Sequence, residues 1–600
     1  MAKKYNAIEN SKSDASATFL KGAAVLTVSM VIVKIFGFVD KILLSNLFSY
    51  FGDSYAAFGT GLYNNAYEIY IPIFTVATAG FPIAISRLIS ESISEKRYKD
   101  VKQIYKVSIP FFAVMGTLCF LIMFGGSFLY VQTIKSPYSL YAMLMLSPSI
   151  LVGCFVSIYR GYFEGQRNMV PTAVSEIFEA GGKLVFGLLI AFLVLKIGKD
   201  QYESTGSVFG MTFGSGGREE AYNTIMAFSV AGAIAGIVLG SLVSLIYLII
   251  RYKVGGDGIP KEYLEKSIDA RGKKEIFITI VKTAIPIGLT ALAMNIGTFF
   301  DSLIIQNVLH SLAQTNGKEI VDQYKAMGVD LSESLKQDTI HTTLWGCYGA
   351  ATPLMQLVTA VTQVFGTSAM PNVTSAWTKG NKAELKTSIE TVIRLTMIFA
   401  LPASFGLVAL ANPIMDIVYV SNTQAVIGAQ VLIVMGFAAL VIACVTPICS
   451  MLQGIGKVRI PLYLFSIGIV IKVVSTFLFV RIPSINIQGG SVGSLVSHLF
   501  ILITAIYLLV KHSKVMPNFV STVIKPAIAA ALSAVGAYFC YMFISNYILM
   551  IPATLISILL AGIIYVTFLL ILRTFTRNEL KFLPKGEKVV TILEKYHLIR

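Results

Sequence analysis

Long apolar stretches separated by short polar connections recur along the whole length of this 600-residue chain. Each stretch can cross the hydrocarbon core of a bilayer as a helix, which takes about 20 residues, and each is too long for a strand of a membrane β-barrel. The pattern therefore predicts an all-α polytopic membrane protein, because backbone groups in lipid must pair within their own segment. The fourteen predicted spans cover residues 18–48, 60–92, 104–132, 139–160, 171–195, 222–250, 276–309, 342–372, 388–413, 425–453, 460–480, 488–510, 521–546 and 549–572.

The composition agrees with a membrane protein and argues against an enzyme. Hydrophobic residues make up 55% of the chain and charged residues only 13%, whereas about a quarter of a soluble protein is charged. The six cysteines have no CxxC spacing and the five histidines form no metal-ligand pattern. The chain also lacks a P-loop, an HExxH motif and a nucleophile elbow. We therefore expect no enzymatic activity, no metal and no cofactor.

The positive charge of the chain follows its topology. The formal net charge is +16, and most Lys and Arg residues lie in alternate connections and at both ends. By the positive-inside rule both termini are then cytoplasmic, as an even number of spans requires. The basicity is a topology signal with some attraction to anionic lipid headgroups, and we expect no nucleic-acid partner.

An internal duplication relates the two halves of the chain. FVDKILLSNLF at 38–48 matches FFDSLIIQNVL at 299–309, and each copy places one acid, Asp40 or Asp301, inside an apolar stretch. The connections after the fourth and tenth spans also match, which sets Lys183 opposite Lys472. Each half holds six spans, so the repeats have the same orientation and are related by a pseudo-two-fold axis along the membrane normal.

The duplication predicts three parts: a first lobe at 1–255 with spans one to six, a second lobe at 256–515 with spans seven to twelve, and a C-terminal part at 516–600 with the last two spans and a cytoplasmic tail. Four connecting segments have a character of their own. They are a flexible Gly/Ser-rich extracytoplasmic insertion at 197–220, a polar one at 310–340 with a short helix at 317–327, a basic linker at 251–275, and an amphipathic tail helix at 577–600.

Ionisable residues inside spans are functional candidates because they are costly in lipid. Lys34 and Lys41 are seven residues apart in the first span and share a helix face. They could form a cationic stripe for a phosphate group, or Lys41 could extend to the interface while Asp40 and Lys41 mark a helix end. Asp40 lies off this face and could pair with a neighbouring helix or bind a cation.

The second span carries three further polar candidates. Asn65 and Glu68 stand among tyrosines, and Glu68 needs a partner such as a lysine of the first span. Arg87 lies near the cytoplasmic end, where it could contact a substrate, act in a gate or anchor the helix at the interface.

The fifth span contains Glu179 and Lys183, four residues apart, which could form an intrahelical ion pair. Lys183 could instead point into a central cavity, as could Lys472 in the eleventh span. Arg160 and Glu164 flank the connection after the fourth span as gate residues or as solvated loop charges. Asp301, deep in the seventh span, could bind Na⁺ or a proton, or form a structural hydrogen bond between helices.

Three segments carry a resemblance to a known family. VKIFGFVDKILLSNLF, GLYNNAYEIYIPIFTVATAGFPIAISRLISE and RGYFEGQRNMVPTAVSEIFEAGGK resemble the polysaccharide-biosynthesis and stage V sporulation protein B group. This group belongs to the multidrug/oligosaccharidyl-lipid/polysaccharide exporter superfamily, and its closest functional relatives are the bacterial lipid II flippases. The resemblance covers nearly the whole chain. The layout of six, six and two spans is similar to the flippases, whereas drug-extruding relatives have twelve spans.

The resemblance implies two lobes around a central cationic cavity that alternates between the membrane faces. Lys34 matches a first-span arginine that the flippases use for pyrophosphate. The order Asp40–Lys41 is transposed relative to the flippases, and an Asp-Arg pair of some flippases appears here as Ala351–Thr352. The sodium-site acids of some members are represented only in part, by Asp301.

Residues and resemblance together predict a flippase that moves an undecaprenyl-pyrophosphate-linked precursor, with lipid II as the leading candidate, across a bacterial plasma membrane. The alternatives are an exporter of another lipid-linked glycan, a drug or cation antiporter, and a scaffold without transport activity. We expect a monomer, alone or with the cell-wall synthesis machinery, that uses a Na⁺ or H⁺ gradient or the membrane potential. The expected residues are Lys34, Lys41, Asn65, Glu68, Glu179, Lys183 and Lys472 for substrate, Asp40 and Asp301 for a coupling cation, and Arg87, Arg160 and Glu164 for a gate.

Overall fold

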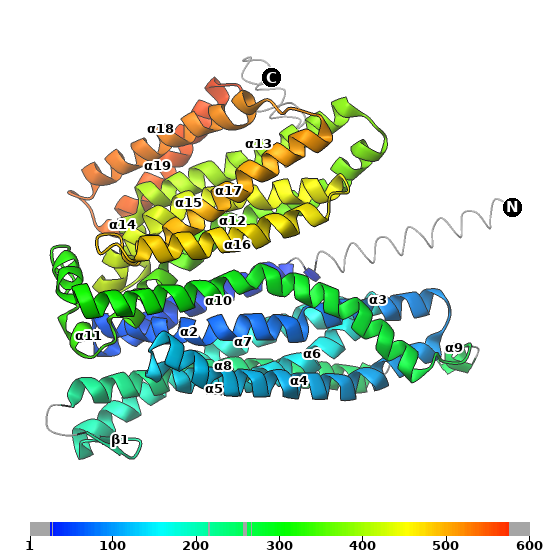
Figure 1. The fold of residues 1–600 in the computed structure, drawn as a ribbon, viewed down its shortest axis with the longest axis horizontal. Coiled ribbons are helices and arrows are strands. Elements are labelled where there is room, and N and C mark those ends of the chain that lie inside the picture. Colours follow the sequence, from blue (N-terminus) through cyan, green and yellow to red (C-terminus); the bar gives the residue numbers. More distant parts are fainter. Residues whose placement is uncertain (1–24, 27, 214–216, 256–260, 266, 575–600) are drawn as a thin grey trace. The chain divides into compact units, whose positions relative to one another are not determined.

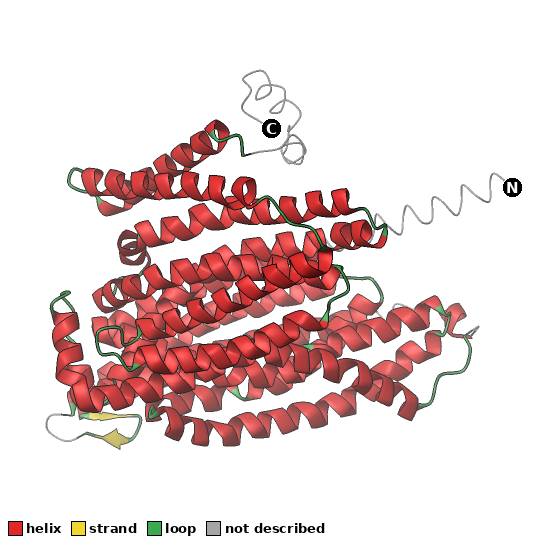
Figure 2. Cartoon of the chain, turned by 45° about the horizontal axis from the view of Figure 1, so that its top comes forward, coloured by secondary structure: helices red, strands yellow, loops and turns green. Residues whose placement is uncertain are grey.

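The computed structural model describes residues 25, 26, 28–213, 217–255, 261–265 and 267–574 (Figure 1). Helices make up nearly all of this described part, and one two-stranded hairpin is its only sheet (Figure 2). Internal contacts divide the chain into two units, one up to Leu303 and one from Ile304 on. The boundary falls inside a single long helix, so the two units share one element.

The first unit contains the helix that precedes the labelled elements and twelve further helical or extended segments before the shared helix. These elements are the helix at 28–48, η1 (Ser49–Phe51), α2 (Asp53–Thr78), α3 (Gly80–Ser94), α4 (Tyr98–Ile134), η2 (Pro137–Ser139), α5 (Leu140–Leu146), α6 (Pro148–Gly165), α7 (Val170–Thr205), β1 (Ser207–Val208), β2 (Met211–Thr212), α8 (Arg218–Gly255), α9 (Lys261–Glu265) and the first part of α10 (Lys273–Lys325).

The second unit begins within α10 and ends in two apolar helices. Its elements are the last part of α10, α11 (Ser332–Lys336), α12 (Ile340–Thr378), α13 (Lys382–Ala409), α14 (Ala411–Val418), α15 (Asn422–Gly454), α16 (Arg459–Val480), α17 (Gln488–Ser513), the π-helical turn η3 (Val520–Ile524), α18 (Lys525–Ile544) and α19 (Met550–Ile571).

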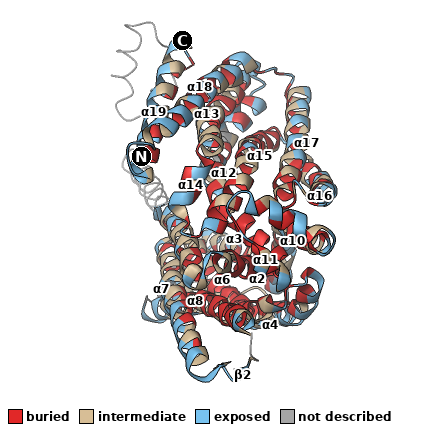
Figure 3. Ribbon diagram, turned by 90° about the vertical axis from the view of Figure 1, so that its left-hand side faces the viewer, coloured by how far each residue is buried: buried red, intermediate tan, exposed pale blue. Residues whose placement is uncertain are grey.

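The fold class predicted from the sequence is confirmed. Eleven helical segments of the described residues are long and apolar enough to cross a membrane. The first, seventh and eighth predicted spans coincide with the helix at 28–48, with α10 and with α12. Some helices, such as α15, are mostly buried, whereas α19 is mostly exposed (Figure 3). Its exposed side chains include Leu559 and Ile563, as expected for a surface that lipid covers. The exact number of fourteen spans stays a prediction.

The connecting segments depart from the sequence prediction at one place. The segment 197–220 is not a flexible loop at its start, because α7 continues to Thr205 and ends at Gly206 in the left-handed conformation with φ of 66°. The hairpin of β1 and β2 follows, with Ser207 opposite Thr212. The helix predicted at 317–327 is confirmed up to Lys325, after a break at Asn316. The predicted tail helix at 577–600 lies outside the described residues.

The basic linker is partly helical. It contains the end of α8, the short α9 and an irregular piece at 267–272 before α10 begins. The lobe boundaries predicted after residues 255 and 515 stay predictions.

A seam of glycines holds α7 against α8, and these two helices are in extensive contact. A Cβ on Gly182 would lie 2.7 Å from the Cα of Gly240, and a Cβ on Gly236 would lie 2.4 Å from the Cα of Gly187. The two backbones therefore touch, which is how small residues let helices approach in membranes. The seam also fixes the rotation of α7, because Gly240 faces the backbone of Glu179 and Lys183.

Two neighbouring glycines give a test of this seam. Gly182→Ala should lower the free energy of unfolding by about 1–3 kcal/mol, because overpacking forces the backbones apart. Gly181→Ala should be neutral or stabilising by up to about 1 kcal/mol, because alanine favours a helix over glycine and the nearest atom, Phe36 Cε2, is 3.7 Å away. Thermal unfolding of both variants in detergent measures the difference, and equal melting temperatures would contradict the seam.

Candidate functional site

A buried ion pair lies at the centre of the first unit. Asp40, on the helix at 28–48, is 1% exposed, and its Oδ2 is 3.0 Å from Nζ of Lys183 on α7. An isolated carboxylate in a membrane bundle is strongly disfavoured, and removing one partner of a buried pair leaves an uncompensated charge. The prediction that Asp40 pairs with a neighbouring helix is therefore confirmed, and Lys183 is its partner.

Aromatic rings surround the same ammonium group. Nζ of Lys183 lies 5.8 Å from the ring centroid of Tyr63 and 5.3 Å from that of Tyr67, both on α2. The Tyr63 hydroxyl donates a hydrogen bond to that of Tyr67. Cation–π contacts of this kind stabilise a desolvated ammonium. The positive charge of Lys183 thus interacts with Asp40 and with two tyrosines, which lie on other helices of the first unit.

A second ion pair lies one turn away on α7. Nη2 of Arg160 is 2.7 Å from Oε2 of Glu179, and Nε of Arg160 donates to Oγ of Ser175 at 2.9 Å. Oε1 of Glu179 accepts a hydrogen bond of 3.1 Å from Ser241 on α8. Arg160 is four-fifths buried, so it joins α6 to α7 rather than lying in a solvated loop. Its role in a gate stays a prediction.

The intrahelical Glu179–Lys183 pair considered from the sequence is wrong. Both side chains project from successive turns of α7, but each takes a partner on another helix. The physical reason is that an exposed intrahelical pair contributes only about 0.2–0.5 kcal/mol, whereas the interhelical pairs also neutralise Arg160 and Asp40.

Two further acids complete this cluster: Glu176, which sequence reasoning missed, and Glu164, whose predicted gate role stays a prediction. Glu176 lies three residues before Glu179 on α7, and its Oε2 accepts a hydrogen bond of 3.2 Å from Ser29 on the first helix. The helical spacing of Glu176, Glu179 and Lys183 is the signal that could have found it. Glu164, at the end of α6, has Arg160 and Glu176 as charged neighbours.

The two candidate lysines of the first span, Lys34 and Lys41, have different surroundings from Lys183 on α7. Lys41 is partly buried and interacts electrostatically with Lys183, Glu68 and Asp40. This agrees with the prediction that Glu68 has a first-span lysine as a charged neighbour. Lys34 is exposed. Within the described residues neither Lys34 nor Lys41 forms an ion pair, in contrast to Lys183 and Arg160.

Two other candidates of the first unit lie outside the cluster. Asn65 is fully buried, and its Nδ2 donates a hydrogen bond of 2.9 Å to Ser139 of η2, so its amide connects two elements. Arg87 is exposed on α3 and makes no ion pair with any residue that the structure describes. The substrate and gate roles predicted for them stay predictions.

The candidates of the second repeat are also partly buried. Asp301 on α10 is 5% exposed, and the next residue, Ser302, accepts a hydrogen bond of 2.7 Å from the Tyr130 hydroxyl. Lys472 on α16 has His498 of α17 as an electrostatic neighbour, a residue that sequence reasoning missed. In the described parts of the chain, no three His, Cys, Asp or Glu side chains are arranged to hold a metal ion.

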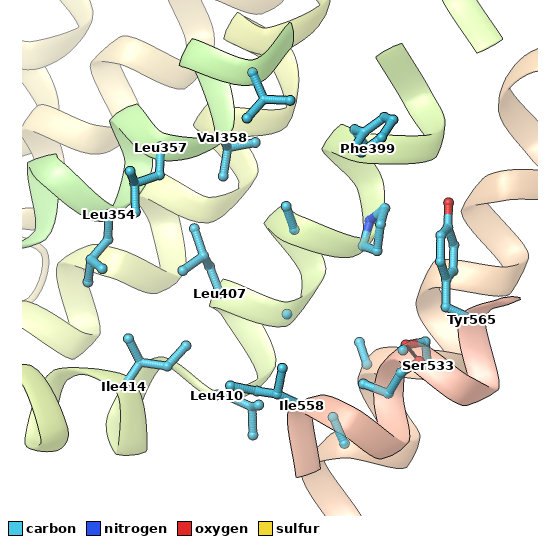
Figure 4. Close-up of a pocket in the computed structure, with 18 residues that line it drawn as sticks. Leu354, Leu357, Val358, Phe399, Leu407, Leu410, Ile414, Ser533, Ile558 and Tyr565 are labelled. Atoms are coloured by element: carbon cyan, nitrogen blue, oxygen red, sulfur yellow. Dashed lines mark hydrogen bonds between the residues drawn. The ribbon is translucent and has the colours of Figure 1, made fainter. Parts of the chain in front are cut away.

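An apolar cavity of about 480 Å³ lies within the second unit, between α12, α13, α14, α18 and α19 (Figure 4). Leucine, isoleucine, valine and phenylalanine side chains line half of it, and most of the other lining residues are alanine, glycine or proline. The hydroxyl of Ser533 donates to the carbonyl of Ala561, and that of Tyr565 donates to the carbonyl of Ile398. With its polar atoms bonded to backbone, the cavity suits a hydrocarbon chain and not a charged group.

A membrane bundle with apolar outer faces and paired charges inside defines the general class of a polytopic transporter, and known proteins specify it further. Residues 19–313 match the family model described as Polysaccharide biosynthesis protein, and residues 346–478 match the MatE model. The chain belongs to the multidrug/oligosaccharidyl-lipid/polysaccharide exporter superfamily.

Three proteins illustrate the relationship. The chain is 22% identical to the Lipid II flippase MurJ of Bacillus subtilis (strain 168), over 83% of this chain and 84% of that protein. It is 23% identical to Stage V sporulation protein B of the same organism, over 95% of this chain and 98% of that protein. A structure of Lipid II flippase MurJ in an inward closed conformation is 14% identical, with a TM-score of 0.58 over 91% of this chain and 98% of that chain. At this identity the structural likeness shows the fold.

The ion pair predicts an asymmetric mutational response. Lys183→Met should destabilise the protein by about 3–5 kcal/mol, because it leaves the carboxylate of Asp40 buried without its partner. Asp40→Asn should cost less, since Lys183 is 20% exposed and keeps its tyrosines. The double variant should be more stable than the sum of the two losses predicts.

Chemical or thermal unfolding of the purified variants in detergent measures this coupling. Lys253→Met, at the exposed end of α8, serves as the control and should change stability by less than about 0.5 kcal/mol. Strict additivity of the Asp40 and Lys183 effects would rule out a pair that stabilises the bundle.

Proposed function

We propose that this chain is a flippase that carries an undecaprenyl-pyrophosphate-linked cell-wall precursor, with lipid II as the leading substrate, from the inner to the outer leaflet by alternating access. The observation that carries the proposal is the charge arrangement of the first unit. Lys183 and Arg160 are neutralised by Asp40 and Glu179, whereas Lys34 and Lys41 have no ion pair among the described residues. Two cations without an ion pair suit an anionic headgroup.

The spacing of these two lysines fits a pyrophosphate. Seven residues of helix correspond to about 10 Å along one face, and lysine side chains are long enough to reach a common group from both ends of that interval. Charge-assisted hydrogen bonds from ammonium to phosphate oxygen are among the strong ones. Lys34 and Lys41 are therefore the proposed headgroup contacts.

Lys183 becomes available to the same headgroup only when Asp40 is neutralised. A proton or a Na⁺ ion on Asp40 would release the ammonium of Lys183, so binding of the cation and binding of the anion would favour each other. This gives a cation gradient a role in coupling, with the membrane potential as a further source. Moving one charge across 100 mV contributes about 2.3 kcal/mol, which is enough to bias a two-state equilibrium of a few kcal/mol.

The apolar cavity beside α18 and α19 supports a substrate with a lipid tail. Its volume of about 480 Å³ holds part of a long prenyl chain while the rest stays in the membrane. The name of one relative, the Lipid II flippase MurJ, supports the same substrate class. We place the protein in a bacterial plasma membrane as a monomer with both termini cytoplasmic, alone or beside the cell-wall synthesis machinery.

One observation favours a second candidate substrate. The model that matches residues 19–313 is described as a polysaccharide biosynthesis protein, so another lipid-linked glycan is the alternative cargo. Its pyrophosphate would use the same lysines. Depletion of the protein in its host, followed by identification of the undecaprenyl-linked intermediate that accumulates in the inner leaflet, distinguishes the two substrates.

The headgroup contacts are testable in vesicles that contain the purified protein and lipid II. Lys34→Ala and Lys41→Ala should each slow flipping about tenfold or more, because a hydrogen bond to a charged group contributes about 1.5–3 kcal/mol and 1.36 kcal/mol is a factor of ten in rate. Lys34→Arg should retain most activity, since the charge remains. Lys253→Ala is the control for loss of an exposed lysine. Normal flipping by both alanine variants would exclude these residues as headgroup contacts.

A further inference from the structure

The end of the basic linker lies against the turn between α3 and α4. Arg271 makes three ion pairs there: Nη1 is 3.3 Å from Oε1 of Glu91, Nη2 is 3.0 Å from Oε2 of Glu95, and Nε is 3.0 Å from Oδ2 of Asp100. One guanidinium thus contacts carboxylates at the end of α3 and at the start of α4. The planar fork of arginine is suited to this because its N–H groups point in several directions.

Asp100 is the buried centre of this contact. It is 1% exposed, its Oδ1 accepts a hydrogen bond of 2.7 Å from the backbone N–H of Arg271, and its Oδ2 is 2.8 Å from Nε of Arg97. Withdrawal of Arg271 would leave this buried carboxylate with Arg97 as its remaining ion-pair partner. Opening would thus remove one of two ion pairs and a backbone hydrogen bond from a buried carboxylate, so the contact resists opening.

Further bonds attach the residues before Arg271. Nζ of Lys99 is 2.9 Å from Oδ1 of Asp269, and the backbone N–H of Lys99 donates to Oγ of Ser267 at 3.1 Å. The hydrogen bond from Lys99 holds the pKa of Asp269 below its usual value, so this carboxyl is charged at neutral pH. The side-chain amide of Gln103 donates to the carbonyl of Arg271. The piece at 267–271 is therefore bound at both ends.

α10 continues directly from this piece and contacts the first unit at two more levels. A Cβ on Gly80 would lie 2.1 Å from the carbonyl oxygen of Ala284, so α3 and α10 cross in backbone contact. Further along, Tyr130 of α4 stacks on Phe299 and donates to Ser302. From Ile304 on, α10 belongs to the second unit, where Tyr324 donates a hydrogen bond to Asn486.

We propose that Arg271 and Asp100 form a permanent cytoplasmic latch, which keeps the first half of α10 attached to α3 and α4 throughout transport. The proposal rests on the alternating-access function proposed above. The latch holds the end of the linker against α3 and α4, so the linker cannot change its conformation during transport. A rearrangement of the two units must therefore occur through a change along α10. Arg271 is a positioning residue, since it acts through α10 and touches no substrate.

Distance measurements on the full-length protein in nanodiscs test the latch without a transport assay. Spin labels replace the exposed Lys106 of α4 and Lys282 of α10 in a background without the native cysteines. The unaltered latch should give one narrow distance distribution, which stays unchanged when lipid II is added. Arg271→Ala should broaden it, Arg271→Lys should give an intermediate width, and Lys274→Ala, which removes an exposed lysine three residues on, should leave it narrow.

Two outcomes of this measurement overturn the proposal. A distribution in Arg271→Ala that equals the unaltered one means that Arg271 does not hold α10. A distribution that shifts on addition of lipid II with Arg271 in place means that the latch opens. If the alanine variant fails to fold, the lysine variant decides the first point.

A disulfide between Lys99→Cys and Ser267→Cys tests permanence through activity. Oxidised and reduced forms should flip lipid II at rates within about twofold of each other, because a permanent contact loses nothing when it is made covalent. If only about a tenth of the Arg271→Ala molecules keep α10 in place, the flipping rate of that variant falls about tenfold. The disulfide should restore this rate, because it holds α10 in place covalently. Loss of flipping on oxidation that is reversed by reduction would show a latch that must open. If the unaltered protein flips no lipid II at all, the proposed function fails, and the spin-label distances still decide the latch.

Discussion

The structure of the first unit depends on the requirement that a carboxylate in a membrane bundle must have a positive partner. Asp40 meets this requirement through Lys183, and Lys183 reaches it because the glycine seam holds α7 in one rotation against α8. One turn away the same seam presents Glu179 to Arg160. Two ion pairs on successive turns thus connect α6, α7 and the helix at 28–48. Charges that would be costly separately become the contacts that join these helices.

Most of the fold could be predicted from the sequence, and the partners inside it could not. Apolar length located every predicted span on a helix, because a lipid-facing helix must satisfy its own backbone and its residues need no particular neighbour. The Glu179–Lys183 pair failed because spacing along one helix says nothing of what another helix presents. Arg160 was ambiguous for the same reason, since it lies close to a polar connection yet points into the bundle. Glu176 could have been found from its helical spacing, whereas His498 gave no signal of its own.

The two copies of the repeated helix have diverged at one informative position. Lys41 follows Asp40 in the first copy, and Ser302 follows Asp301 in the second. Ser302 accepts a hydrogen bond from Tyr130, so the serine serves packing between α10 and α4, while Lys41 keeps a positive charge near Glu68. The shared acid agrees with a common origin of the two helices. The residue after the acid therefore distinguishes the two helices. The first copy has a cation there, Lys41, and the second has Ser302, which bonds α10 to α4.

That second role explains why α10 is longer than a bilayer requires. The part of α10 before the break at Asn316 already exceeds the roughly 20 residues that cross the hydrocarbon core. This part has contacts in the first unit near Ala284 and Ser302, and Tyr324, which is bonded in the second unit, lies after the break. The contacts of Arg271 fix the start of α10, since three carboxylates hold one guanidinium there. Within the first unit, the first half of α10 is therefore held near its start by Arg271 and again at Ser302 by Tyr130.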